Sequence, residues 1–379
     1  MSIVLKGITW DHPRGYQPLI ACSAVYETDF GVKVEWHKRS LTAFGDQSLE
    51  ELCNQFDLLI IDHPHVGLAA ARKYLEPLDN IISLDDLSEL NAQSAGPSFQ
   101  SYYYQGRQWA LPVDAAMQCA VYRPDMIAKK DIPSNWDQVF KLAEKLKHND
   151  SYLGIAFSPT DCLCSFLSLT AQANSPIREE NAELVNIDIG LNVLEQLKKI
   201  KNSFHPACLD WTPISLLDYM SSSDDVVYSP LTFCYNNYSR NNFRKEKLIF
   251  HDVPGSHNAV LGGAGISVSQ FCKNKIIAGK FAAWICSPVI QRTIYADAQG
   301  QPGNIVAWTD ERVNDITNDF FYNTIKTLEN AYVRPRYNGW AEFQTKMGNI
   351  IHDFLKYDKD ANEVIAELNT LFQKSGINK

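Results

Sequence analysis

The sequence predicts an α/β protein built from two domains. Strand-like runs alternate with amphipathic helical segments, as in the strand pattern of residues 3 to 9 and the helical pattern of Leu49–Gln55. The chain has 379 residues, of which 45% are hydrophobic, and domains usually span roughly 100 to 200 residues, so two cores are expected. Thirdly, an extended stretch around Asp114 is typical of a segment that leaves one domain and enters another.

Composition excludes several classes of partner. A net charge of -9 with a sequence pI near 5.5 argues against binding nucleic acid, which needs a basic surface. Since no run of about 18 apolar residues occurs, no membrane span is expected. Nine cysteines without framework-like spacing favour reduced thiols, and the start MSIVLKGITW does not resemble a secretory leader. We therefore expect a cytoplasmic location as the sequence is written, or a periplasmic or extracellular one if a leader has been removed.

The stretch Tyr102–Met126 is predicted to connect the two domains. It reads YYYQGRQWALPVDAAMQCAVYRPDM, and Pro112 predicts an interruption between two strands just before Asp114. A hinge is expected near residues 112 to 116. A ligand cleft would then lie beside Asp114.

Polar side chains follow two predicted strands of the first domain, residues 3 to 9 and the apolar run at residues 56 to 61. Ligands of open α/β sheets bind beyond the carboxyl ends of strands. The pattern His-Pro-His lacks a third ligand at motif spacing, so no metal site is expected there; the imidazoles either donate to a polar ligand or belong to a solvated helix start. The candidate binding residues of this domain are Trp10, Asp11, His12, Arg14, His63 and His65.

The second domain has two comparable loops. One follows the predicted strand Leu153–Phe157 and contains Asp161, and the other spans residues 232 to 240. Aromatic faces and amide groups suit sugar rings and their hydroxyls, although the tyrosines could instead pack a domain interface. The candidates in the second loop are Tyr235, Asn237 and Tyr238.

A glycine-rich return strand follows at residues 261 to 269. Its Gly-Gly-Ala-Gly run, which includes Gly263, is neither a dinucleotide fingerprint nor a phosphate loop. Glycines there allow close approach of a neighbouring strand or a ligand. No nucleotide or other cofactor is expected.

Several of these stretches together resemble the family 1 extracellular solute-binding proteins. The carriers of the resemblance are GRQWALP at residue 106, LGGAGISVS at 261, the CSPVIQ segment at 286, GQPGN at 300 and RPRYNGW at 334. The resemblance implies the two-lobe type II periplasmic-binding-protein fold, in which each lobe is a mostly parallel sheet flanked by helices, hinge strands join the lobes, and a cleft holds the ligand. Lobe 1 would comprise residues 1–113 and about 260–310, and lobe 2 residues 114–259 and about 311–379.

The resemblance also implies a function. The chain would bind a small polar solute as the substrate-binding component of an ABC-type transporter, or as a leaderless relative of one, with a permease as partner and as a monomer. A neutral sugar would stack on Trp10, Trp308 or Trp340, while Asp11 or Asp114 accepts hydroxyl protons. A ligand carboxylate or phosphate gripped by Arg14 is the alternative, and we favour the sugar.

One enzymatic alternative is open. Thiaminase-like enzymes of this broad fold use a cleft cysteine, and Cys119 follows Asp114 by five residues, with Asp114 or His12 as a base. The other interpretation is that Cys119 packs in the core of its strand. Because no G-x-S-x-G, H-E-x-x-H or kinase motif occurs, we expect a binding protein rather than an enzyme.

Overall fold

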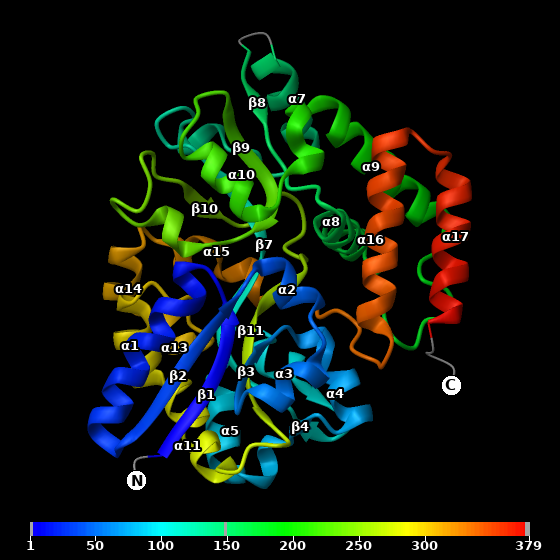
Figure 1. Cartoon of the computed structure of the whole chain (residues 1–379). Helices are drawn as coiled ribbons and strands as arrows, with labels where there is room; N and C mark the ends of the chain where they lie inside the picture. The colour runs from blue at the N-terminus through cyan, green and yellow to red at the C-terminus, as the bar shows by residue number, and fades with distance from the viewer. Residues whose placement is uncertain (1–2, 148–149, 376–379) are drawn as a thin grey trace. The chain divides into compact units, whose positions relative to one another are not determined.

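The computed structural model describes residues 3–147 and 150–375, and the chain divides into two compact units (Figure 1). The first unit comprises Met1–Ala116, Gly262–Asp315 and Arg336–Asn338, and the second comprises the remaining segments Met117–Leu261, Ile316–Pro335 and Gly339–Lys379. Strands and helices alternate in both, which confirms the α/β class. In these described ranges, no helix combines the length and the apolar character needed to cross a membrane.

The sheet of the first unit is built around β1. This strand pairs in parallel with β2 on one side and with β3 on the other, and β11 continues the sheet antiparallel to β3. The register places Trp10 opposite Arg39, and Ile61 opposite Gly265. The strands are β1 (Ile3–Trp10), β2 (Val32–Arg39), β3 (Leu58–Ile61), β4 (Leu75–Glu76) and β11 (Leu261–Ser269), with a separate hairpin of β5 (Tyr103–Tyr104) and β6 (Arg107–Gln108).

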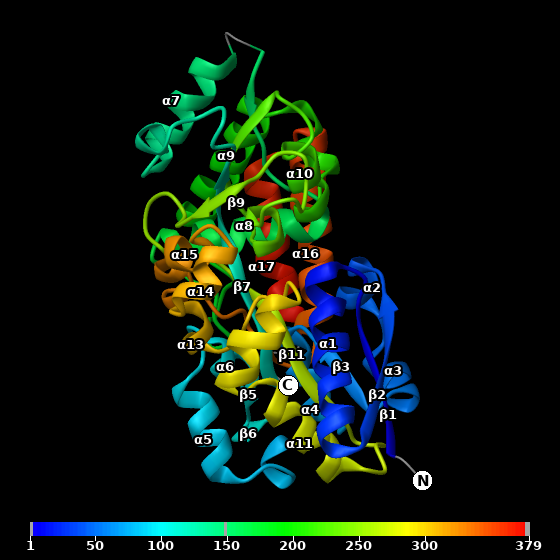
Figure 2. The same cartoon turned by 90° about the vertical axis from the view of Figure 1, so that its left-hand side faces the viewer.

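Helices cover both faces of this sheet, as Figure 2 shows for α1 and α11 on one side. Alternate strand residues point to opposite faces, so Leu58 and Ile60 pack with α1 and α11, whereas Leu59 and Ile61 pack with α3 and α4. The helical segments are α1 (Pro13–Phe30), α2 (Leu41–Asp46), α3 (Leu49–Gln55), η1 (His63–His65), α4 (Val66–Arg72), η2 (Leu78–Asn80), α5 (Leu84–Ala92), α6 (Ser98–Ser101), α11 (Lys275–Ile285), α12 (Pro288–Ile290), η6 (Gln291–Tyr295), α13 (Ile305–Trp308) and α14 (Glu311–Ile316).

Strand β7 (Leu111–Tyr122) begins in the first unit and ends in the second. The predicted interruption at Pro112 is wrong, since the strand runs without a break. Pro112 is only its second residue, a position where a missing N–H is tolerated, and the ladder continues from Ala115, whose N–H donates to the carbonyl of Gln301 at 3.1 Å.

The sheet of the second unit is centred on the last part of β7. It pairs antiparallel with β9 (Val226–Phe233) and with β10 (Ile249–His251), and β8 (Tyr152–Leu153) pairs in parallel with β9. The strand expected over residues 153 to 157 is therefore shorter. The N–H of Gly154 still donates to the carbonyl of Tyr228 in β9 at 2.9 Å, whereas the N–H of Phe157 donates to the carbonyl of Cys208, outside the sheet.

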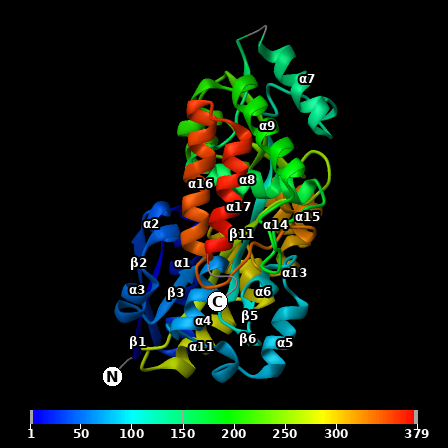
Figure 3. The same cartoon turned by 90° about the vertical axis from the view of Figure 1, so that its right-hand side faces the viewer.

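Helices surround this second sheet, and Figure 3 shows α16 and α17 side by side along the C-terminal part of the chain. Their amphipathic faces bury residues such as Ile351 and Leu368 at helical spacing. The helical segments are η3 (Lys129–Asp131), α7 (Trp136–Lys147), α8 (Pro159–Gln172), α9 (Ile187–Ser203), η4 (Pro206–Asp210), α10 (Pro213–Met220), η5 (Asn236–Ser239), α15 (Phe320–Glu329), α16 (Trp340–Tyr357) and α17 (Ala361–Lys374).

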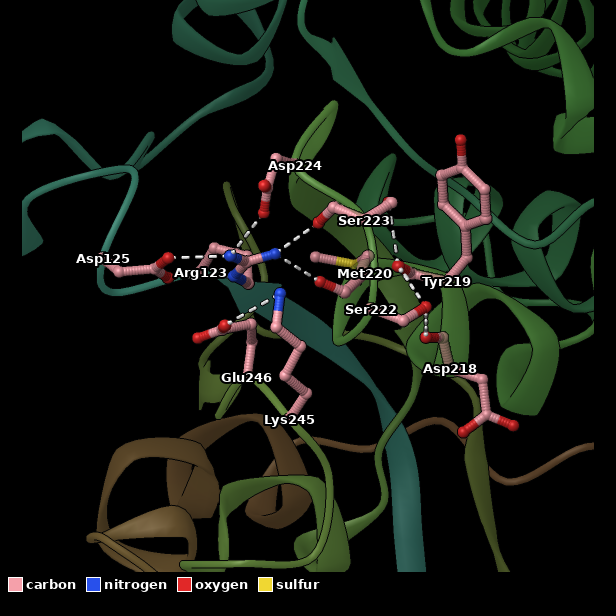
Figure 4. Close-up of polar contacts among 10 residues, drawn as sticks. All are labelled: Arg123, Asp125, Asp218, Tyr219, Met220, Ser222, Ser223, Asp224, Lys245 and Glu246. Carbon is pink, nitrogen blue, oxygen red and sulfur yellow. Dashed lines mark hydrogen bonds and ion pairs between the residues drawn. The ribbon is translucent and has the colours of Figure 1, made fainter.

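Arg123, directly after β7, holds the end of this strand in the second unit by hydrogen bonds (Figure 4). Its Nη1 donates to the carbonyls of Met220, at the end of α10, and of Ser223. The Nε and Nη2 atoms form a two-bond pair with Asp125, and Nη2 also donates to Asp224 at 3.1 Å. These five acceptors match the five N–H donors of a guanidinium, so Arg123 is a closed structural site with no donor left for a ligand.

Candidate functional site

Three strands of the first unit end at one edge of its sheet. Because β1, β2 and β3 are parallel, their carboxyl ends lie together, and the loops that begin at Trp10, Arg39 and Asp62 start at the same edge. The N–H of Asp11 donates to the carbonyl of Arg39 at 2.7 Å, which joins the first two loops. The structure thus brings together the two polar loops that the sequence indicated.

The loop after β1 is short, because α1 begins at Pro13, three residues after the strand ends at Trp10. His12 is the N-cap, and its Nδ1 accepts a hydrogen bond from the N–H of Arg14 at 3.1 Å. Proline at the first helical position suits a helix start, which explains the early beginning. Asp11 lies outside the helix, is largely exposed and pairs with Lys38 at 2.8 Å.

Arg14 and Asp114 form a buried ion pair. The Nε of Arg14 lies 2.8 Å from Oδ2 of Asp114, and its Nη2 lies 2.5 Å from Oδ1, the two-bond geometry that favours a guanidinium on a carboxylate. The two side chains are 4% and 0% exposed. Burial raises the pKa of Asp114, while the charge and the hydrogen bonds of Arg14 act in the opposite direction. Two of the three guanidinium nitrogens of Arg14, Nε and Nη2, therefore donate hydrogen bonds to Asp114.

The backbone around Asp114 is packed closely by two other segments. A Cβ at Gly263 would lie 2.5 Å from the carbonyl oxygen of Asp114, and the φ of Gly263 is 98°, so this position needs glycine. On the other side, the Nε2 of Gln301 donates to the carbonyl of Ala115 at 2.8 Å. The start of β7 is consequently held from two sides in the first unit.

The two histidines lie in η1, directly after β3. The side chain of Asp62 accepts from the N–H of His63, and Nδ1 of His63 lies 3.2 Å from the same carboxylate. The ring of His63 is 6.3 Å from that of Tyr102 in an edge-to-face arrangement. Among the residues that the structure describes, no three His, Cys, Asp or Glu side chains are grouped to hold a metal ion.

Trp308 lies in α13 and is fully buried. Its Nε1 donates to the carbonyl of Pro302 at 2.7 Å, and residue Pro302 forms an antiparallel bridge with Asp114. The indole therefore supports the backbone that adjoins Asp114.

The loop after β9 is the polar loop of the second unit. The Tyr238 hydroxyl donates to Oδ1 of Asp218 at 2.8 Å, and the same oxygen accepts from Nε of Arg244 at 2.7 Å. Burial is the main cause that raises the pKa of Tyr238. Tyr238 thus anchors the loop, and the ring of Tyr235 lies 6.5 Å from it. Asn237, which precedes Tyr238 in η5, is buried as well.

Asp161 occupies the first turn of α8, where its Oδ2 accepts from the Ser158 hydroxyl at 2.5 Å. Burial raises the pKa of this carboxyl to about 7, against the lowering by Ser158. Trp340 begins α16 directly after Gly339, and its ring lies 5.1 Å from that of Phe343. The ligand-binding role of the candidate residues in both units stays a prediction.

Cys119 does not meet the requirements of a nucleophile. It is 0% exposed and lies in β7 opposite Thr232 of β9, one residue before the segment of β7 that pairs with β10. Asp114, one of its two proposed bases, is paired with Arg14. The enzymatic alternative is therefore not supported, and the thiol packs in the interior of the sheet.

Sequence reasoning missed Arg39 as a residue of the strand edge. Its Nη2 donates to the carbonyl of Ile60 at 2.8 Å, its guanidinium lies 5.2 Å from the ring of Phe44, and burial lowers its pKa to about 10. The only signal was a charged residue that ends the alternating run VKVEWHKR.

Comparisons with known proteins agree with this fold. Residues 24–315 match a family model described as bacterial extracellular solute-binding protein. A ribitol-bound ABC transporter solute-binding protein of Agrobacterium radiobacter is similar in structure, with a TM-score of 0.83, 18% identity and 98% coverage of both chains. The GacH receptor of Streptomyces glaucescens, solved with acarbose, has a TM-score of 0.83 at 16% identity, covering 99% of this chain and 98% of that one.

A third relative is the maltotriose-bound maltotriose-binding protein of Thermus thermophilus. Its TM-score is 0.77 at 16% identity, and the likeness covers 98% of this chain and 99% of that one. At such identities the likeness establishes the fold, which is the two-lobe type II periplasmic-binding-protein fold, while the family model covers more than half of the chain. The chain therefore belongs to the bacterial extracellular solute-binding protein family.

Proposed function

We propose that the protein binds a small polar solute, a carbohydrate or polyol, in the cleft of its periplasmic-binding-protein fold, and serves as the substrate-binding component of an ABC-type transporter. The observation that carries the proposal is family membership together with a fold shared over almost the whole chain with sugar- and polyol-bound proteins. Loops rich in aromatic, amide and imidazole groups support it, because these groups recognise hydroxyls and the faces of sugar rings.

The ion pair between Arg14 and Asp114 favours a ligand without a net charge. Both oxygens of Asp114 are engaged by this guanidinium, so the pair carries no net charge toward a ligand. A carboxylate or phosphate ligand would have to displace Asp114 from a buried ion pair, which is costly. We therefore propose a neutral ligand, recognised by hydrogen bonds and ring stacking.

A ligand panel tests the function. Maltose, maltotriose, ribitol and acarbose are compared with a set of small organic acids by thermal unfolding and small-angle scattering. Binding to the folded state at 100 times the dissociation constant adds about 2.7 kcal/mol to the free energy of unfolding, and lobe closure lowers the radius of gyration. Affinity for a neutral ligand should be insensitive to salt. If the midpoint of thermal unfolding and the radius of gyration stay unchanged for every compound, the binding function is refuted.

The partner and the location extend this proposal. A transporter permease is the expected protein partner, the protein itself is expected to be a monomer, and the expected location is that of the extracellular family to which the chain belongs. All nine cysteines are buried, and burial raises the pKa of thiols such as Cys22 and Cys208. Protonated, inaccessible thiols resist oxidation, so they permit export as well. Light scattering and cell fractionation decide these two points.

A further inference from the structure

Arg39 is a largely buried cation that has no carboxylate partner among the side chains that the structure describes. It is the last residue of β2, and its side chain is 9% exposed. Burial lowers the pKa of Arg39 to about 10, and no neighbouring carboxylate of the described residues raises it. Asp11 on the adjoining loop pairs with Lys38 instead. A cation removed from water without a counter-charge is costly, so an anion at this position would stabilise the protein.

The guanidinium of Arg39 also has more donors than acceptors. Its Nη2 donates to the carbonyl of Ile60 at 2.8 Å, and its Nη1 lies 3.5 Å from the carbonyl of Ala43. The buried Nε has no acceptor in the described part of the chain. Arg123 is the opposite case, since five acceptors match its five donors. The donors of Arg39 are thus only partly used, and a buried donor without an acceptor costs free energy.

A second unsatisfied donor lies on the neighbouring strand. Trp10 is the register partner of Arg39 in the parallel pair of β1 and β2, and its indole is buried. The Nε1–H of this indole finds no acceptor within the described ranges. Both groups lie against the ring of Phe44 in α2, at 5.3 Å for the indole ring and 5.2 Å for Cζ of Arg39. The two donors therefore belong to one cluster of the first unit.

The side of this cluster that α2 covers is not closed. Phe44 is half-buried, and Ser40, which follows Arg39 directly, is exposed. The Ser40 hydroxyl accepts the N–H of Ala43 at 3.1 Å, which leaves its own O–H able to donate. An oxyanion offers several acceptor oxygens at once, and a guanidinium binds such a group through two parallel bonds. The chemistry of the cluster therefore fits a small oxyanion.

We propose that Arg39 and Trp10 form a binding site for a small oxyanion, of the phosphate or sulfate class, at the carboxyl ends of β1 and β2. The anion supplies the negative charge that Arg39 lacks and the acceptors for its Nε–H and for the indole N–H of Trp10. This site is separate from the ion pair of Arg14 and Asp114. The proposal goes beyond the binding of a neutral solute, because the anion is a second ligand and not a part of the solute.

Two conservative variants remove the donors one at a time. Trp10→Phe removes the indole N–H and keeps an aromatic ring, while Arg39→Met removes the charge and keeps a long side chain. Trp36→Phe is the matched control for the indole, because its Nε1 already donates to Oγ of Ser23 at 2.9 Å. Arg312→Met is the matched control for the charge, because Arg312 also belongs to the first unit and is half exposed.

The first measurement is thermal unfolding in millimolar inorganic phosphate, without any sugar and at constant ionic strength. The midpoint of the wild type should rise saturably by about 2 to 4 °C, and both controls should do the same. Arg39→Met should show only the shallow rise that exclusion of phosphate from protein surfaces causes. A wild-type midpoint that rises no more than that of Arg39→Met would overturn the proposal.

The second measurement follows the donors themselves in proton–nitrogen correlation spectra. The signals of the Trp10 indole N–H and the Arg39 Nε–H, identified by their absence from the two variants, should shift as phosphate is added, and that of Trp36 should not. By calorimetry, the dissociation constant for phosphate should rise about tenfold or more in Arg39→Met and about threefold in Trp10→Phe. Unshifted signals at saturating phosphate, or equal dissociation constants in the wild type and both variants, would overturn the site. Because no sugar is present, neither result bears on the solute-binding function.

Discussion

Replacement of Asp114 by leucine should strongly destabilise the first unit. The change leaves the guanidinium of Arg14, a side chain that is 4% exposed, without its carboxylate. Removing one partner of a buried ion pair costs about 3 to 5 kcal/mol, because the remaining charge is neither paired nor hydrated. Replacing both partners, as in Arg14→Met with Asp114→Leu, removes the stranded charge, and its loss should be smaller than that of either single variant.

Urea unfolding of the wild type, the two single variants and the double variant gives a coupling energy. The matched control is the pair of Arg312 and Asp297, also an arginine with an aspartate in the first unit, at 2.5 Å, whose side chains are 47% and 54% exposed. Exposed pairs contribute about 0 to 1 kcal/mol. A coupling for Arg14 and Asp114 that does not exceed the control value would refute the idea that this buried pair organises the strand edge.

Three further predictions concern the second unit. Arg123→Met should cost about 2 to 4 kcal/mol in urea unfolding, since it leaves backbone and carboxylate acceptors without donors; a loss below about 0.5 kcal/mol would contradict the closed site. Burial raises the pKa of Asp161 to about 7, so its contribution to stability is present below about pH 4 and is lost as the pH rises through 7. Between these pH values the free energy of unfolding of the wild type should fall by up to about 4 kcal/mol more than that of Asp161→Asn. An equal change in both proteins would count against the prediction. Burial lowers the pKa of His251 to about 4, so the contribution of His251 to the free energy of unfolding should be lost as the pH falls from about 6.5 to 4. His251→Gln should therefore lose less stability than the wild type across this range, and an equal loss in both proteins would contradict the prediction.

Local periodicity predicted the elements whose signal is local. The helix Leu49–Gln55 has the predicted bounds, because Ser48 caps it and its apolar residues recur at helical spacing. Strand β3 was recognised from an apolar run, as expected for a strand buried on both faces. The polar residues after β1 and β3 were identified for the same reason, since strand ends in parallel sheets are where such residues gather.

What the sequence could not show depends on distant partners. Arg14 and Asp114 are separated by 100 positions, so Arg14 was interpreted as a ligand contact rather than as an ion-pair partner. Pro112 was taken as a break because its neighbours in space are unknown from the sequence. The close approach of the Arg336 carbonyl to Gly67 is equally invisible, since it depends on a missing side chain more than 250 positions away.

The pairing of β3 with β11 has a consequence for synthesis of the chain. Ile61 lies opposite Gly265, so the first sheet cannot be completed until 204 further residues have left the ribosome. At about 5 to 20 residues per second, this delay is roughly 10 to 40 seconds. During that time the apolar edge of β3 is open to chaperones and to other nascent chains. Late pairing would therefore leave the sheet of the first unit incomplete for a large part of the time in which the chain is being made.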